Sequence, residues 1–288
     1  MDLKISSEKI GNPLLVDLLK KLTVCFNSIG QSFFVIGATA RDIILQQLAD
    51  TSSRRKTRDL DVAIAISEWT DFDRITGVLI ENGFKKDTHM HQRFYYGDYE
   101  LDIVPYGSVV KDDDCIYWPP EEVIAMSVKG FDEVLKDAIT VSVDDEFDIK
   151  IASLHGLFLL KFNAWQDRHF ETSKDAEDMS FILSNYFIAN VDRNFHPEVY
   201  DWMRFDEYII GGYWLAHDLL SLLTKEQAAY YRDCIIMELE KEEASLLINQ
   251  ILEHSNYGLT YEQVRDLVKP IVLLCRSATN TDAKWEQP

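Results

Sequence analysis

The stretch FFVIGATARDIILQQLADTSSRRKTRDLD, residues 33–61, decides the fold that this sequence predicts. A short apolar run at 33–36 meets Gly37, and a helical pattern follows from Thr39 to about Leu48. Gly37 permits a tight strand-to-helix turn whose backbone can closely approach a ligand. The first N–H groups of a helix have no partner within it and favour a bound anion. The stretch therefore predicts a strand, a phosphate-binding turn and a helix.

The strand after the polar loop carries an Asp-x-Asp pair. Side chains alternate between the two faces of a strand, so Asp59 and Asp61 project to the same side. The small residues Ala63 and Ala65 continue that side and leave space beside the carboxylates. Hard divalent cations such as Mg²⁺ prefer oxygen ligands of this kind. We therefore expect a site for a metal ion and a nucleotide.

A third carboxylate occurs in the later strand YELDIVPYG. Asp102 lies there between Leu101 and Ile103, which point to the opposite face. A carboxylate within an otherwise apolar strand needs a metal, a cation or a hydrogen-bond donor, unless it faces water at an edge of the sheet. Because it follows an Asp-x-Asp strand, Asp102 is the third candidate ligand.

Composition restricts the classes of function. The chain has 288 residues, 47% of them hydrophobic, and a formal net charge of −20. That length suits one large or two smaller domains. So acidic a chain is a poor candidate for a broad nucleic-acid-binding surface, because Lys and Arg bind phosphate backbones. One dense basic group, Arg54, Arg55, Lys56 and Arg58, is equally well interpreted as a solvated loop.

Neither a secretory nor a membrane segment is expected. The four cysteines show no CxxC spacing, so neither a zinc site nor a disulfide framework is indicated. No N-terminal run resembles a signal peptide, and no run of about 18 apolar residues could span a bilayer. We expect a soluble, cytoplasmic protein without a membrane partner.

Apolar patterns predict the remaining elements. Helices are expected at 12–29, 69–82 and 131–137, and strands at 84–86, 92–96, 99–104, 139–143 and 147–151. Hairpin turns are expected at 97–98 and 144–146, a strand end at Pro105 and a surface loop at 108–120. From residue 152 onward the pattern is helical, with further helices at 197–203, 206–222, 225–254 and 260–277. Gly211-Gly212 is expected to break or kink the helix at 206–222.

The first helix of the second half contains a lysine on its apolar stripe. Burying the Lys161 ammonium without a partner is costly, so it is expected to face an anion or a cleft. The alternative is an apolar stem with an exposed tip. Thr172 and Asp175 resemble a capping box that opens the next helix, where Lys174 and Asp178 are one turn apart.

The order of these parts is more specific than any single part. A glycine turn, an Asp-x-Asp strand, an Asp strand and a helix with an inward lysine together suit nucleotidyl transfer by metal ions. Asp59 and Asp61 would hold two divalent cations, and Asp102 would hold one of them and orient or deprotonate the attacking hydroxyl. The Thr39 hydroxyl would donate to the outer phosphates, and Lys161 would offset the remaining charge.

The segments VIGATARDIIL, TRDLDVAI, LDIVPYG and LLKFNAWQDRHFETSKDAEDMSFIL resemble the nucleotidyltransferase superfamily, and within it the AbiEii/AbiGii toxin-type branch. The resemblance covers roughly residues 30–185. The superfamily has a Gly-Gly or Gly-Ser turn, and this chain departs from it at Ala38, which has no hydroxyl. The resemblance implies a mixed α/β fold: a polymerase-beta-type mixed sheet with flanking helices in residues 1–150, and a helical domain in 151–288 whose first two helices complete the active site.

The branch adds a Lys on the helix after the sheet, an Arg several residues later and a (Lys/Arg)-Asp-x-x-Asp start to the next helix. The catalytic residues implied by the resemblance are Asp59, Asp61, Asp102 and Lys161, the three aspartates also being the metal ligands. The nucleotide-binding residues it implies are Gly37, Ala38, Thr39, Arg41, Lys161, Arg168, Lys174, Asp175 and Asp178.

The resemblance also implies an activity. A nucleoside monophosphate would pass from a nucleoside triphosphate such as ATP to a hydroxyl acceptor, first an RNA or tRNA end, with two Mg²⁺ ions or Mn²⁺ in their place. Some members are toxins of toxin–antitoxin or phage-defence pairs, which implies a cognate antitoxin as partner. Two alternatives stay open: a catalytically idle binding or regulatory protein of this fold, and a small-molecule nucleotidyltransferase of the aminoglycoside type with a cationic acceptor.

Overall fold

The computed structural model describes residues 2–51, 58–123, 125–193, 206–255 and 259–279. The chain divides into two compact units, residues 1–153 and 154–288, and the change of element type predicted near residue 150 lies close to this division. Arg54, Arg55 and Lys56 of the basic group, and the helix predicted at 197–203, lie outside the described residues.

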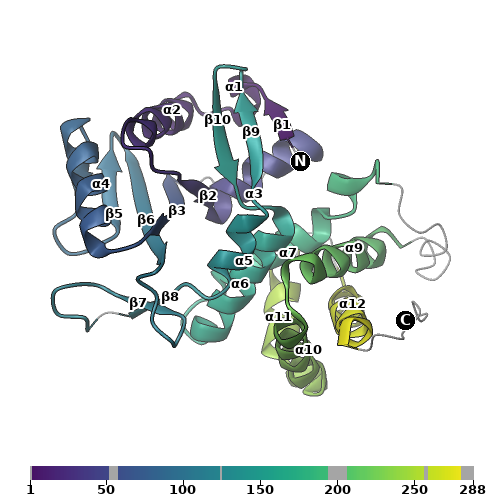
Figure 1. The fold of residues 1–288 in the computed structure, drawn as a ribbon. Helices are drawn as coiled ribbons and strands as arrows, with labels where there is room; N and C mark the ends of the chain where they lie inside the picture. Colours follow the sequence, from purple (N-terminus) through teal and green to yellow (C-terminus); the bar gives the residue numbers. More distant parts are fainter. Residues whose placement is uncertain (1, 52–57, 124, 194–205, 256–258, 280–288) are drawn as a thin grey trace. The chain divides into compact units, whose positions relative to one another are not determined.

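The first unit is built on an eight-stranded mixed sheet with the strand order β1-β9-β10-β2-β3-β6-β5-β4 (Figure 1). Its strands are β1 (Asp2–Ile5), β2 (Phe34–Ile36), β3 (Asp59–Ile66), β4 (Lys85–Lys86), β5 (Arg93–Tyr96), β6 (Tyr99–Gly107), β9 (Ile139–Val143) and β10 (Phe147–Ile151). β3 and β6 are parallel, whereas β2–β3 and β5–β6 are antiparallel. A sheet with both kinds of pairing and flanking helices confirms the predicted mixed α/β class.

The helices of the first unit are α1 (Ser7–Ile10), α2 (Pro13–Ser28), α3 (Gly37–Leu48), α4 (Trp69–Glu81) and α5 (Phe131–Lys136). The Lys86 ammonium lies over the ring of Phe72 on α4, at 5.5 Å, and over that of Phe94 on β5, at 5.8 Å. α4 therefore packs on the sheet face to which Phe94 points. On that face Leu60 and Leu101, which pair with each other across β3 and β6, are fully buried. Because one face is the core, the alternating Asp59 and Asp61 point the other way.

Strand β6 continues beyond its predicted end, through Pro105 to Gly107. β5 pairs with β6 only as far as Arg93 opposite Asp102, and Gln92 accepts one further hydrogen bond, from the Ile103 amide. Beyond that point β6 has β3 beside it and no pairing with β5. Proline lacks an N–H group and is tolerated at such an open edge.

Both predicted hairpins are confirmed, β5–β6 across Gly97-Asp98 and β9–β10 across residues 144–146. The predicted surface loop at 108–120 contains half of a further hairpin, β7 (Cys115–Tyr117) with β8 (Ala125–Ser127). The N-terminal strand β1, which the apolar pattern did not indicate, pairs in parallel with β9 at an edge of the sheet.

The second unit is helical in its described part. Its elements are α6 (Leu154–Arg168), α7 (Lys174–Asn185), η1 (Ile188–Asn190), α9 (Glu207–Leu222), α10 (Lys225–Leu239), η2 (Glu242–Ala244), α11 (Leu246–Glu253) and α12 (Tyr261–Thr279). The long helix predicted at 225–254 is wrong, because it is divided between α10 and α11. The Glu238 carboxylate turns inward and accepts hydrogen bonds from the Ser245 hydroxyl at 2.9 Å and the Leu247 amide at 3.3 Å, which ends one helix and starts the next.

The predicted break at Gly211-Gly212 is also wrong, since α9 runs through both glycines without interruption. Both are buried, and a methyl group added to Gly212 would lie within 3.0 Å of the backbone carbonyl oxygen of Leu267 on α12. The glycine therefore allows two helices of this unit to approach closely, which is a packing role rather than a kink.

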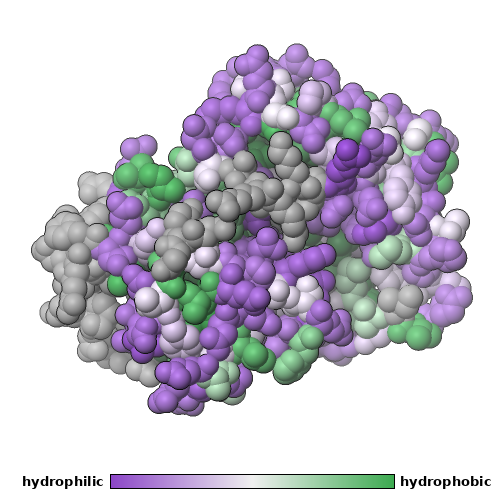
Figure 2. All heavy atoms as spheres, turned by 180° about the vertical axis from the view of Figure 1, so that it is seen from behind, coloured by the Kyte–Doolittle hydropathy of each residue, from purple (hydrophilic) through white to green (hydrophobic). Residues whose placement is uncertain are grey.

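On the face drawn in Figure 2, hydrophilic residues predominate and apolar ones form small separate patches. Large exposed apolar side chains of the described residues, such as Val123 and Phe170, are scattered along the chain. In the part of the chain that the structure describes, no helix is long and apolar enough to cross a membrane.

We predict that Gly212→Ala destabilises the protein by about 1–3 kcal/mol, because overpacking against Leu267 outweighs the helix propensity of alanine, worth about 1 kcal/mol. Gly77→Ala on α4 is the matched control: an added methyl there meets open space, so it stabilises by about 0.5–1 kcal/mol. Urea titration followed by circular dichroism measures both. A Gly212→Ala variant as stable as the parent would contradict the close approach.

Candidate active site

The predicted acidic residues come together on the neighbouring strands β3 and β6. Asp61 on β3 pairs with Asp102 on β6 on one side and with Ile36, the last residue of β2, on the other. Register partners on adjacent strands point to the same face, so the two carboxylates project side by side. Asp59 lies two residues before Asp61, is exposed, and points the same way.

Gly37 places the start of α3 directly against Asp61. Its φ is +69°, in the left-handed region, and an added Cβ would lie within 3.0 Å of Asp61 Oδ2. The helix N-cap is Ile36, which supplies no side-chain hydrogen bond to the first amides of α3. The positive end of the helix dipole therefore lies beside the Asp61 carboxylate.

Other predicted phosphate-binding residues of α3 have structural contacts. The Thr39 hydroxyl, expected as a donor to phosphate, donates instead to the carbonyl oxygen of Asp59 at 3.0 Å and joins α3 to β3. Arg41 is buried, and its Nε and Nη2 lie 2.8 and 2.7 Å from Asp42 Oδ1. Ala38 is half-buried in the first turn. Their part in nucleotide binding stays a prediction.

Asp102 is held by an arginine that the sequence analysis did not select. Arg93 Nε donates to Asp102 Oδ1 and Arg93 Nη2 to Asp102 Oδ2, both at 2.8 Å. The third nitrogen, Nη1, lies 2.7 Å from Glu100 Oε2. The hydrogen bonds to Asp102 raise the pKa of Arg93 above its ordinary value, so the guanidinium stays charged.

A signal for this contact is present in the sequence. A two-residue turn at Gly97-Asp98 makes Tyr96 and Tyr99 partners, and counting back along both strands pairs Arg93 with Asp102. The parallel register of β3 and β6 places Glu100 beside Asp59. The carboxylate face therefore holds four acidic side chains, one more than the sequence analysis selected.

The donor set fits a hard cation in part. Asp59 and Asp61 provide carboxylate oxygens on one face, as Mg²⁺ or Mn²⁺ requires. Both oxygens of Asp102 are hydrogen-bonded to Arg93, however. Accordingly, among the residues that the structure describes, no three His, Cys, Asp or Glu side chains are arranged to hold an ion. Asp59 and Asp61 would hold a metal, whereas Asp102 could join them only after leaving Arg93.

In the second unit Lys161 does face anions, as predicted, but these belong to the chain. Its Nζ lies 2.7 Å from Asp178 Oδ2 and 3.3 Å from Asp175 Oδ1. Arg168 also binds Asp175, with Nε at 2.7 Å from Oδ2 and Nη2 at 2.9 Å from Oδ1. The Asp175 side chain is fully buried, whereas Lys161 and Arg168 are partly exposed. The ion pairs therefore fasten α6 to α7.

The capping box predicted at Thr172 and Asp175 is wrong. The N-cap of α7 is Ser173, and the Thr172 hydroxyl accepts a hydrogen bond from the Lys174 amide at 3.2 Å. The Asp175 carboxylate points into the ion-pair cluster because Lys161 and Arg168 on α6 offer it charged donors. Lys174 is exposed, and Asp178, its predicted partner one turn later, pairs with Lys161.

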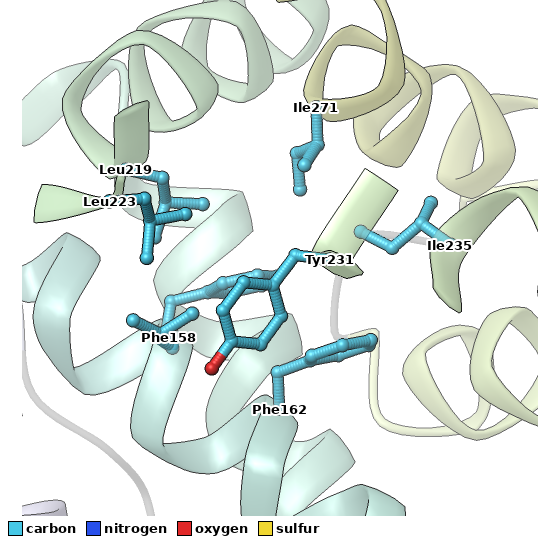
Figure 3. A pocket seen from close by; sticks show the side chains of 8 residues that line it. Phe158, Phe162, Leu219, Leu223, Tyr231, Ile235 and Ile271 are labelled. Atoms are coloured by element: carbon cyan, nitrogen blue, oxygen red, sulfur yellow. The ribbon is translucent and has the colours of Figure 1, made fainter. Parts of the chain in front are cut away.

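A crevice among the helices of the second unit is lined by side chains that do not suit catalysis. Figure 3 shows its lining, which is entirely apolar apart from one tyrosine hydroxyl: Phe158, Leu159, Phe162, Leu219, Leu223, Tyr231, Ile235 and Ile271. No lining side chain carries a charge, so the crevice offers neither a metal ligand nor an acid or base.

No protein-family model and no curated protein sequence matches this chain. Among solved structures, it is similar to ANT(2'')-Ia in complex with adenylyl-2''-tobramycin, with a TM-score of 0.36 and 14% identity over 59% of this chain and 88% of that one. It is also similar to the solution structure of the antibiotic-resistance factor ANT(2'')-Ia, with a TM-score of 0.35 and 14% identity over 62% and 88% of the two chains. A likeness at these values establishes neither the activity nor the substrate of this chain.

We predict that Gly37→Ala is more destabilising than Gly30→Ala. Both glycines have a positive φ, which costs alanine about 1–2 kcal/mol, but only the added methyl at Gly37 meets Asp61, and that at Gly30 meets open space. When Asp61 is also replaced by alanine, most of the additional loss of stability that Gly37→Ala causes relative to Gly30→Ala should disappear. Urea titrations measure the stability of four variants, Gly37→Ala and Gly30→Ala, each with and without Asp61→Ala. Equal losses of stability for Gly37→Ala and Gly30→Ala would exclude the close contact.

We predict that Asp175→Ala destabilises the protein by about 2–3 kcal/mol, because it removes the buried counter-ion that Lys161 and Arg168 share and leaves Lys161 with Asp178 alone. Asp167→Ala, at an exposed position of α6, is the control and should stay within about 0.5 kcal/mol of the parent. Thermal and urea unfolding measure both. Equal effects of the two substitutions would show that the ion pairs add nothing.

Proposed function

We propose that this chain is a metal-dependent nucleotidyltransferase that moves a nucleoside monophosphate from a nucleoside triphosphate to a hydroxyl acceptor and releases pyrophosphate. One observation carries the proposal: the N-terminus of α3 touches the Asp61 carboxylate at Gly37, and Asp102 is the register partner of Asp61 on the next strand. A phosphate-binding element and two carboxylates therefore lie at one place.

Charge explains why such a place needs a cation. A triphosphate drawn to the first amides of α3 would lie beside the negative charge of Asp61, and the two anions repel each other unless a cation lies between them. Asp59 and Asp61 would hold Mg²⁺ or Mn²⁺ there. When bound, such ions neutralise phosphate charge and polarise the bond that breaks. Asp102, once released by Arg93, would bind a second ion and accept the proton of the attacking hydroxyl.

We also propose Lys161 and Arg168 as nucleotide-binding residues, as the resemblance implies. Within the second unit, Asp175 and Asp178 fix the positions of these two side chains and leave part of each exposed. Lys174, exposed at the start of α7, is a further candidate for a phosphate contact. Buried carboxylates suit this positioning role, because they restrict long side chains that would otherwise sample many conformers.

The first acceptor we propose is the hydroxyl of an RNA or tRNA end, with ATP as the first donor to test and a role as the toxin of a toxin–antitoxin or phage-defence pair. A net charge of −20 suits a basic antitoxin as partner. The same charge would attract a cationic small molecule, so aminoglycosides and polyamines belong in the acceptor panel. A catalytically idle binding protein is the second candidate, favoured by the engagement of both Asp102 oxygens with Arg93.

We predict that the purified chain labels an acceptor from an α-labelled nucleoside triphosphate with Mg²⁺ or Mn²⁺, and that a chelator abolishes the labelling. Asp61→Asn should lower the rate at least about 100-fold, because the charge that holds the ion is lost. Asp73→Asn, an exposed aspartate of α4, is the control and should label like the parent. Equal labelling by Asp61→Asn and the parent would exclude this site.

Calorimetry with Mg²⁺ and a non-hydrolysable triphosphate separates the two candidates. Metal-dependent binding that Asp61→Asn weakens, together with labelling of an acceptor, supports the enzyme. Metal-dependent binding without labelling of any nucleic-acid or small-molecule acceptor supports the idle binding protein. Absence of both contradicts the metal–nucleotide site itself.

A further inference from the structure

Arg93 is a cationic side chain that lies directly against Asp102, one of the proposed metal ligands. Its guanidinium binds both oxygens of Asp102, at 2.8 Å each, and also reaches Glu100 at 2.7 Å. The Arg93 side chain is 22% exposed, so its guanidinium is largely shielded from water but can still reach solvent. Bidentate, charge-assisted contacts of this kind are among the strongest that a side chain makes.

The carboxylate face is divided by this contact into two halves. Asp59 and Asp61 on β3 form one half, and their register partners Glu100 and Asp102 on β6 form the other. Arg93 comes from β5, on the far side of β6, and binds both members of the second half. An arginine and a divalent ion satisfy the same carboxylate oxygens, so they cannot both occupy Asp102 in full.

We propose that Arg93 is a positioning residue that acts as a latch on Asp102: while the fork is closed the site takes one divalent ion, at Asp59 and Asp61, and the second ion binds only when Arg93 releases Asp102. The proposal rests on the metal–nucleotide site proposed above and deepens it.

The latch has a physical rationale. Four carboxylates on one sheet face repel one another, and a built-in cation offsets part of that repulsion when no ion or nucleotide is bound. On release, the guanidinium and the second ion exchange partners: Asp102 passes to the metal, and Arg93 stays beside Glu100 or turns to a phosphate oxygen. The two ions would therefore bind in sequence, the ion at Asp59 and Asp61 first and the ion at Asp102 second.

Binding of Mn²⁺ alone tests the latch, with free ion followed by electron paramagnetic resonance and heat by calorimetry. The parent should bind one ion per chain above the weak background of an acidic surface. Arg93→Ala should bind a second ion, or bind its ions at least about tenfold more tightly, because Asp102 is then available. Arg93→Lys, which keeps the charge but not the fork, should lie between the two.

Removing any positive charge from so acidic a chain would strengthen cation binding non-specifically. Arg74→Ala is therefore the charge-matched control: Arg74 is exposed and pairs with Asp71 on α4, away from the carboxylate face. It should show only that small non-specific gain in affinity and leave the number of bound ions unchanged. The gain of Arg93→Ala should vanish in the double variant Arg93→Ala, Asp102→Asn, whose remaining carboxylates hold one ion.

The outcomes are separable. Unchanged Mn²⁺ binding by folded Arg93→Ala, or a gain that survives Asp102→Asn, overturns the latch, even if the parent transfers nucleotides. A gain that depends on Asp102 in a chain that labels no acceptor supports the latch and counts against the enzymatic function. If Arg93→Ala does not fold, Arg93→Lys and Arg93→Gln decide, since parent-like binding by both overturns the proposal.

Discussion

The contact between Gly37 and the Asp61 carboxylate is the constraint on which the first unit depends. It lies where β2 ends and α3 leaves the sheet, beside the acidic side chains of β3. A side chain at residue 37 would displace Asp61, and displacing Asp61 would separate the helix N-terminus from the carboxylate pair. The register of the sheet then brings the third carboxylate to the site, because the partner of Asp61 on β6 is Asp102.

The sequence predicts this centre well because its causes are local. The apolar run before Gly37, the alternation through Asp59 and Asp61, and the apolar neighbours of Asp102 are all readable within a few residues, and the structure has the strands and helix that they predict. What the sequence does not reveal directly depends on partners distant in the chain. Arg93 is conspicuous only once the β5–β6 register is counted outward from the turn to its fourth pair, Arg93 with Asp102.

The errors in the helical half share a cause. Gly211 and Gly212 would interrupt an isolated helix, but here Gly211 packs closely against Phe187 and Gly212 against Leu267 of α12. Asp175 has the sequence spacing of a cap and is drawn instead into a pair with Lys161 and Arg168. Glu238 divides a continuous helical pattern because it binds Ser245. In each case tertiary contact overrides a local preference.

The two-residue turn at Gly97-Asp98 has a consequence for how this chain can diverge. Side chains alternate along a strand, so one inserted or deleted residue there would rotate β5 by half a period. The aromatic ring of Phe94 would then enter the acidic face, and the guanidinium of Arg93 would be driven into the core beneath α4. A substitution within the turn leaves the strand register intact, whereas a change in the length of the turn would disrupt both the acidic face and the core.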